Sequence, residues 1–229
     1  MQKIITKFIA PNGAETEVLY YMNYSKLMRE DPLFTRNEFT PSGKFGIPLV
    51  RKQVISLDGI SLIAYSDTKQ DDNAMNKAKG VHFFIDDYRF RDIYRNPERS
   101  LAKLSQYRFL LTPDYSLYSD MQPWRQIESV AHSRWCGAFW QSKGLIAVPT
   151  ISWSTPHSFQ YCFDGVEMHS TVSVGMIGCK KNKLAFLRGY ESMLEKIEPN
   201  AIICFGEPFP EMQGNIFPVD YLSSRKVVR

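Results

Sequence analysis

Five apolar runs of strand length between Val81 and Pro218 constrain the fold of this 229-residue chain more than any other feature. Each run ends in a polar or aromatic cluster with a proline or glycine beside it, and most of the intervals are typical of helices. Repeated β-α-β connections of this kind give a parallel sheet, and ligands bind outside the carboxyl ends of its strands. The endings therefore predict where a site lies. They are Phe84-Ile-Asp-Asp-Tyr-Arg, Leu111-Thr-Pro-Asp-Tyr-Ser, Val148-Pro-Thr-Ile-Ser-Trp, Val174-Gly-Met-Ile-Gly and Cys204-Phe-Gly-Glu-Pro.

Strands and helices are expected to alternate after residue 80. A complete eight-stranded barrel typically takes about 250 residues, so a stretch of about 140 residues is short for one. We therefore expect a reduced or irregular TIM-like (β/α) barrel, with an open doubly wound parallel sheet as the alternative. The expected strands are 81–85, 109–111, 145–148, 171–174, 201–205 and 216–219, and the expected helices are 97–104, 123–141, 156–163 and 184–197.

The first 80 residues have the turn signals of a small β-rich segment. We expect a boundary near residue 80, which separates an N-terminal segment, 1–80, from a β/α core, 81–229, that carries the site. The elements expected in the N-terminal segment are strands at 4–9 and 16–21 around Pro11-Asn-Gly, a hairpin around Asp58-Gly59 and a polar linker at 67–80.

Composition narrows the class of protein. Hydrophobic residues make up 44% of the chain and aromatic residues 14%, which is typical of a folded globule. No apolar run approaches the length of a membrane span, and Met1-Gln-Lys-Ile-Ile has no secretory pattern. The four cysteines are scattered without a Cys-x-x-Cys pair, as expected for reduced thiols. We therefore expect a cytoplasmic protein with no membrane partner.

The strand endings supply acidic candidates for catalysis. Asp86, Asp114 and Glu207 each follow a predicted strand and could together hold Mg²⁺ for phosphodiester cleavage, since hard cations prefer carboxylate oxygens. His157, in the loop before a short helix, is a further acid–base candidate. The structural alternative is that these carboxylates cap helices and form turns.

A second set of residues is suited to binding a ligand. Aromatic rings can stack on a base or nucleotide, while an arginine binds phosphate and a hydroxyl donates a hydrogen bond. Packing in the hydrophobic core is the alternative explanation for the aromatic residues. The candidates are Arg134, Trp135, Tyr115, Ser116 and Trp153.

The glycine-rich and Walker-type loops of the common dinucleotide and NTPase folds are absent from the sequence. Two carboxylates that flank a glycosidic bond would suit a glycosidase. The ending Phe205-Gly-Glu-Pro is similar to the Asn-Glu-Pro ending of many barrel glycosidases, with Gly206 in place of the asparagine. The net charge of +4 is only mildly basic, which is less than many dedicated nucleic-acid binders carry.

Several separated motifs between about residues 80 and 210 resemble, in order, an uncharacterised domain family encoded largely by phages, plasmids and related mobile elements of bacteria. The resemblance implies a mobile-element context and no particular reaction. The motifs are Phe84-Ile-Asp-Asp-Tyr-Arg-Phe, Leu111-Thr-Pro-Asp-Tyr-Ser, Ser133-Arg-Trp-Cys-Gly, Val148-Pro-Thr-Ile-Ser-Trp, Phe163-Asp-Gly and Phe205-Gly-Glu-Pro.

Three functions remain open at this point. The first is a phage or mobile-element protein that binds, and in one version processes, nucleic acid or a nucleotide at the strand-end cleft. The second is a non-catalytic anti-defence protein that inhibits a host immune protein or sequesters its nucleotide signal. The third is an enzyme similar to the glycoside hydrolases. No motif decides between an enzyme and a binding protein.

Overall fold

The computed structural model describes residues 2–9, 15–22, 29 and 31–220. It divides into two compact units, residues 1–38 and 39–229. In the first unit, β1 (Gln2–Ile9) pairs antiparallel with β2 (Glu15–Met22), which confirms the two strands expected there. The turn expected at Pro11-Asn-Gly lies outside the described residues. A short helix, α2 (Pro32–Thr35), follows, with Asp31 capping its N-terminus.

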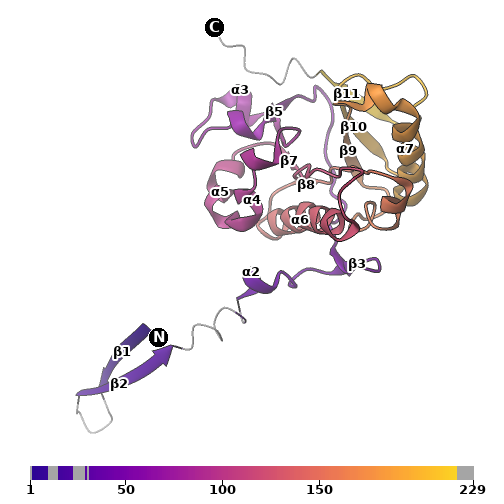
Figure 1. The fold of residues 1–229 in the computed structure, drawn as a ribbon. Helices are drawn as coiled ribbons and strands as arrows, with labels where there is room; N and C mark the ends of the chain where they lie inside the picture. Colours follow the sequence, from indigo (N-terminus) through magenta and orange to yellow (C-terminus); the bar gives the residue numbers. More distant parts are fainter. Residues whose placement is uncertain (1, 10–14, 23–28, 30, 221–229) are drawn as a thin grey trace. The chain divides into compact units, whose positions relative to one another are not determined.

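The second unit is a mixed α/β structure built on two parallel sheets. One sheet has the order β5-β6-β7-β8 and the other the order β9-β10-β11 (Figure 1). A parallel bridge between Thr150 and Ser173 links the segment after β8 to β9. The strands of these sheets are β5 (Leu62–Ala64), β6 (Gly80–His82), β7 (Phe109–Leu111), β8 (Ala147–Val148), β9 (Thr171–Gly175), β10 (Ala201–Phe205) and β11 (Ile216–Val219). Two short strands precede them and pair antiparallel with each other, β3 (Pro41–Ser42) and β4 (Ile47–Pro48).

Helices lie around the outside of these strands, with α4 and α5 on one side in Figure 1 and α7 on the other. None of the helices in the described residues is long and apolar enough to cross a membrane. The α-helices are α3 (Ala74–Lys77), α4 (Asp92–Arg95), α5 (Pro97–Leu104), α6 (Pro123–Ser142) and α7 (Lys183–Ile197). The 3-10 helices are η1 (Tyr65–Asp67), η2 (Asp87–Arg89), η3 (Pro156–Gln160) and η4 (Cys179–Asn182).

The strand β10 illustrates why an apolar run becomes a central parallel strand. All five of its residues are buried. Because side chains alternate across a strand, Ile202 and Cys204 join a hydrophobic cluster with α7, whereas Ile203 and Phe205 join a second cluster on the opposite face. The second cluster includes residues of β5, β7, β8 and β11, so strands of both sheets share it.

Most expected elements of the core are confirmed, with shifts of one to three residues at several ends. The prediction of a hairpin around Asp58-Gly59 is wrong. A turn does form there, with Gly59 at φ 59° and a hydrogen bond from Ile60 N to Leu57 O of 3.2 Å. However, the residues before the turn form no strand, and β5 after it pairs in parallel with β6.

The boundary between the two compact units lies after Glu38, not near residue 80. The physical reason is the pairing of β5 with β6, in which Leu62 lies opposite Gly80 and Ala64 opposite His82. This pairing makes the segment from Phe39 to residue 80 part of the same core as the later strands.

Candidate functional site

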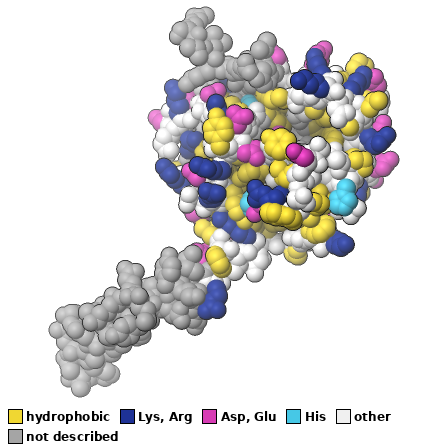
Figure 2. Space-filling view, viewed as in Figure 1, with side chains coloured by type: hydrophobic (Ala, Val, Ile, Leu, Met, Phe, Trp, Pro, Cys, Tyr) yellow, Lys and Arg dark blue, Asp and Glu magenta, His cyan; other side chains and the backbone are white. Residues whose placement is uncertain are grey.

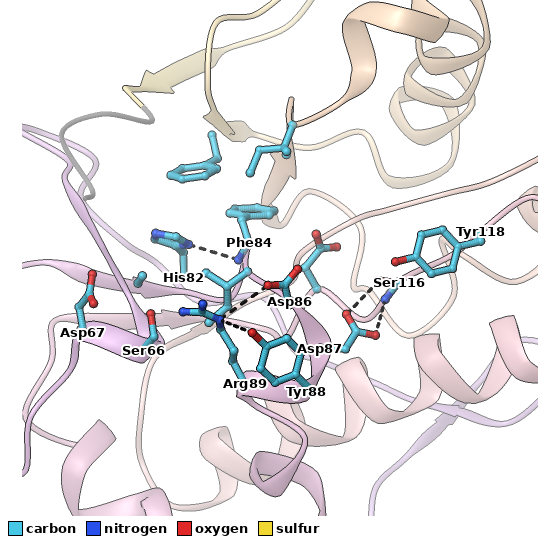
Figure 3. A pocket seen from close by; sticks show the side chains of 16 residues that line it. Ser66, Asp67, His82, Phe84, Asp86, Asp87, Tyr88, Arg89, Ser116 and Tyr118 are labelled. Atoms are coloured by element: carbon cyan, nitrogen blue, oxygen red, sulfur yellow. Dashed lines mark hydrogen bonds and ion pairs between the residues drawn. The ribbon is translucent and has the colours of Figure 1, made fainter. Parts of the chain in front are cut away.

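A cleft of about 1010 Å³ lies at the carboxyl ends of β5, β6, β7, β9 and β10 (Figure 3). This is the edge of the sheets at which the sequence predicts a site. The lining residues come from the last positions of these strands and from the segments that follow them. They are Ala64, Ser66, Asp67, His82, Phe84, Ile85, Asp86, Asp87, Tyr88, Arg89, Asp114, Ser116, Tyr118, Gly175, Ile177 and Phe205.

Aromatic rings form an apolar part of the cleft wall. The rings of Phe84 and Phe205 stack with centroids 4.8 Å apart and an interplanar angle of 10°. The imidazole of His82 lies 4.4 Å from the ring of Phe205. Gly175 allows this packing, because a Cβ atom there would come within 2.9 Å of the Phe84 ring. The cleft wall is therefore backed by an aromatic pair that is almost wholly buried, with Phe84 7% and Phe205 0% exposed.

The charged side chains of the lining are mostly acidic. Four aspartates, Asp67, Asp86, Asp87 and Asp114, share the cleft with Arg89, the one Lys or Arg among the described residues that line it. In the view of Figure 3, Asp67 and Ser66 lie to one side of His82 and Phe84, and Ser116 and Tyr118 lie to the other. Outside the cleft, basic and acidic side chains are interspersed on the face shown in Figure 2.

Two neighbouring carboxylates differ in their surroundings. Asp87 accepts hydrogen bonds from the backbone N of Ser116 at 3.1 Å and from its hydroxyl at 2.9 Å, which joins the segment after β6 to the segment after β7. Asp86 is exposed, and its Oδ2 lies 3.7 Å from Nε of Arg89.

Asp114 is held in a more apolar environment. Burial is the main reason that the pKa of this carboxyl is raised to about 7. A hydrogen bond from Ser152 and the charge of Arg134 oppose the rise, and the charge of Asp87 adds to it. At neutral pH the group therefore exchanges protons readily, as a general acid or base must.

The sequence-predicted candidates separate into two groups. Asp86, Asp114 and Ser116 line the common cleft. Glu207 does not; its side chain is 83% exposed, lies 3.7 Å from Lys180 and lines a neighbouring hollow of about 460 Å³. His157 is exposed on η3, where its ring approaches Tyr161 with centroids 6.4 Å apart.

Arg134 is buried in α6, where its guanidinium binds the backbone instead of lining the cleft. It donates to the carbonyl oxygens of Thr150 at 2.7 Å, Cys162 at 3.1 Å and Asp164 at 3.2 Å. Burial lowers its pKa to about 10, so the side chain stays protonated at neutral pH. These contacts give the arginine a structural role between α6 and the segments after β8.

The aromatic candidates also lie outside the lining of the cleft. Trp135 is buried and stacks on Phe139 with centroids 5.1 Å apart. Trp153 is partly buried and packs on Phe186, 5.0 Å away. Tyr115 meets Phe90 edge to face at 5.2 Å. All three make the core contacts that were the alternative to ligand stacking.

Within the part of the chain that the structure describes, no group of three or more His, Cys, Asp or Glu side chains has the arrangement of a metal site. Asp86 and Asp114 share a cleft that Glu207 does not line, so the three carboxylates expected to hold Mg²⁺ are not brought together.

Several lining residues escaped the sequence-based reasoning, among them Asp67 and His82. Asp67 was assigned to an exposed linker. A signal was present, because Leu62-Ile-Ala-Tyr-Ser-Asp is another apolar run that ends in an aromatic and polar cluster. His82 lies inside an apolar run, whose pattern predicts a buried strand position and not a site residue. The stack of Phe84 on Phe205 had no signal in the sequence, since it depends on how distant strands pack.

Comparisons with known proteins agree with the phage-related resemblance. The family model described as a domain of unknown function, DUF4417, matches residues 39–222. The "Gene 1 protein" of Mycobacterium phage L5 is 36% identical over 180 residues, which cover 77% of this chain and 78% of the relative. The "Gene 1 protein" of Mycobacterium phage D29 is 34% identical over 179 residues, covering 77% of this chain and 66% of the relative. No solved structure matches the chain.

Proposed function

This chain belongs to the DUF4417 family, and we propose that it binds a nucleobase, free or within a nucleotide or nucleic acid, in the cleft at its strand ends. The observation that carries the proposal is the combination of exposed aromatic rings, Tyr88 and Tyr118, with carboxylates in one cleft. A base can stack on an exposed tyrosine ring of the cleft and donate its N–H groups to the carboxylates. Stacking of a base on an aromatic side chain contributes about 1–3 kcal/mol.

Charge favours the base over the phosphate as the group inside the cleft. Four aspartates against one arginine repel a phosphate, even with Asp114 partly protonated. The phosphates of a nucleotide or strand would therefore lie toward solvent, with Arg89 as the cation available to them at the cleft. Arg134, the phosphate ligand first expected, is occupied by three backbone carbonyls.

We also infer that the two sheets together form a reduced, irregular β/α barrel. The strands follow one another in chain order from β5 to β11, whereas a doubly wound sheet reverses its order at a switch point. One hydrophobic cluster contains Leu62, Leu111, Val148, Ile203 and Val219, from both sheets, as the interior of a barrel would. An experimental structure with the two sheets packed as separate layers would overturn this inference.

The other functions considered rank below base binding. A non-catalytic anti-defence protein that sequesters a nucleotide would use the same cleft, so turnover of the bound nucleotide distinguishes it from an enzyme. Asp114 could supply the proton transfer that an enzyme needs. A glycosidase has less support, because Glu207 and Asp114 line different hollows instead of facing each other across one groove.

Titration calorimetry of the full chain with the common nucleosides and their 5′-monophosphates tests the proposal. We expect binding that Asp86→Asn and Asp67→Asn each weaken by about tenfold or more, since a hydrogen bond to a charged group is worth about 1.5–3 kcal/mol. Glu207→Gln is the matched control, because it neutralises an exposed carboxylate outside the cleft. The absence of binding by the wild type at millimolar ligand, or equal weakening by the control, would show the proposal to be wrong.

A further inference from the structure

The histidine at the end of β6 has one ring nitrogen bonded and one that is not. His82 is 2% exposed and lines the cleft. Its Nδ1 accepts a hydrogen bond of 3.2 Å from the backbone N of Phe84 (Figure 3). Its Nε2 is buried and has no hydrogen-bond partner among the residues that the structure describes.

These contacts determine the tautomer of the ring. Burial lowers the pKa of His82 to about 3, so the imidazole is neutral at physiological pH. Because Nδ1 accepts from the Phe84 N–H, its lone pair is occupied and it carries no proton. The single ring proton is therefore on Nε2, which makes this atom a donor.

A buried donor without an acceptor is costly. Leaving such a group unsatisfied destabilises a fold, and folded proteins pair nearly all of their buried polar groups. Phenylalanine would fill the same place beside Phe84 and Phe205 without this cost, since the imidazole already packs against both rings, with centroid distances of 5.8 Å and 4.4 Å. Packing therefore does not account for a histidine at this position.

We propose that His82 determines which ligand the cleft accepts, by donating its Nε2–H to an uncharged acceptor, a carbonyl oxygen or ring nitrogen, on the edge of the bound base. This inference rests on the proposed function and deepens it. Because Nε2 is buried in the ligand-free form, this donation requires the side chains around it to move when the ligand binds.

The hydrogen-bonding pattern identifies the chemical class of ligand. The carboxylates of Asp67 and Asp86 accept hydrogen bonds, whereas His82 only donates through Nε2. The ligand must therefore carry donors and an acceptor on one flat ring, as every nucleobase does. An ammonium or guanidinium ligand has donors alone and leaves Nε2 unsatisfied, so the cleft discriminates against simple cations despite its acidity.

The test uses His82→Phe and His82→Gln in the full chain. His82→Phe removes the donor and retains a flat ring, so the ligand-free variant should melt at the wild-type temperature or above it. Its affinity for the nucleosides that the wild type binds should fall by about tenfold or more. His82→Gln places an amide N–H near the position of Nε2 and should restore part of the affinity. Benzamidine, a flat cation, should bind weakly to all three proteins.

Nitrogen-15 NMR of histidine-labelled protein provides a measurement that does not depend on affinity. We expect His82 to be neutral with its proton on Nε2, and this resonance to move when nucleoside is added. Wild-type binding that His82→Phe leaves unchanged would overturn the role of His82 while base binding stands. A proton on Nδ1, or a melting temperature several degrees lower for ligand-free His82→Phe, would also overturn it. If the wild type binds no nucleoside, the proposed function is wrong, and so is the ligand class inferred from His82.

Discussion

Asp87 and Asp114 show how similar side chains acquire different chemistry from their surroundings. Both line the cleft, but Asp87 accepts two hydrogen bonds from Ser116, whereas burial raises the pKa of Asp114. A carboxyl whose pKa lies near neutrality can donate or accept a proton at physiological pH. If the bound base is processed, Asp114 is the residue we expect to transfer the proton.

The raised pKa of Asp114 predicts a pH dependence of stability. The ordinary pKa is 3.8 and the folded-state value is about 7, so folding favours the protonated form. The stability associated with this carboxyl is fully present below about pH 4 and is lost as pH rises to about 7. The melting temperature of Asp114→Asn, minus that of the wild type, should therefore increase between pH 4 and pH 7 and level off above it. A difference that stays constant across this range contradicts the shift.

Asp72 is an aspartate with the opposite behaviour. Burial alone would raise its pKa, but hydrogen bonds from Tyr107, Asn76 and the backbone of Asn73 outweigh burial and lower the pKa to about 2. The bond from Tyr107 is 2.6 Å long and buried. Stability from this network is present above pH 3.8 and is lost as pH falls through about 2.

Tyr107→Phe should accordingly lower the free energy of unfolding at pH 7 by about 1.5–3 kcal/mol, because a buried carboxylate loses a charge-assisted hydrogen bond. The loss should shrink as pH falls below 4. Urea denaturation at several pH values measures both effects. Tyr118→Phe removes an exposed hydroxyl and should change stability by less than about 0.5 kcal/mol. Equal effects of the two variants would contradict the role of the Asp72 network.

At the scale of elements, α6 is held to its neighbours by Arg134. Arg134→Met leaves three backbone carbonyl oxygens without this donor, two of them in buried hydrogen bonds and one in a partly buried one, and should lower the free energy of unfolding by more than about 3 kcal/mol. The control is Arg125→Met on the same helix, where an exposed ion pair with Glu128 is worth about 0–1 kcal/mol. Chemical denaturation compares the two variants. Similar losses of stability would argue against a structural role for the hydrogen bonds of Arg134.

The contact between α7 and the segment after β8 depends on a glycine. A Cβ atom at Gly189 would come within 2.1 Å of Nε1 of Trp153. Helix propensity alone predicts that Gly→Ala stabilises a helix by about 1 kcal/mol. We expect Gly189→Ala to destabilise the fold instead, by about 1–3 kcal/mol, because overpacking displaces the tryptophan. The sign of the change in melting temperature decides between the two effects, and Arg188→Ala on the exposed side of α7 is the neutral control.

At the scale of the whole molecule, the core and the cleft belong to the second compact unit. Every residue that lines the cleft lies after residue 38, and the family match begins at residue 39. A chain of residues 39–229 should therefore fold with the melting temperature of the full chain to within a few degrees and bind the same nucleosides with unchanged affinity. Loss of cooperative unfolding in this fragment would show that residues 1–38 contribute to the core.

Local patterns predicted the elements well where the pattern is long or strongly apolar. The helix expected at 123–141 is α6, and the strands expected at 201–205 and 216–219 have the observed bounds. Their periodicity is a property of neighbouring residues, so it can be read without knowledge of the fold. The prediction of a hairpin at Asp58-Gly59 was wrong because a turn signal does not determine which distant strand the following residues pair with.

The sequence by itself determined the alternation of strands and helices, the family and the edge of the sheets at which a cleft lies. Only the tertiary structure decided which side chains meet there. Pairing of β5 with β6 brings Asp67 into the cleft, backbone carbonyls occupy Arg134, and Glu207 lines a separate hollow. The reason is physical: strand order and side-chain burial depend on contacts between residues far apart in the chain, which local periodicity does not encode.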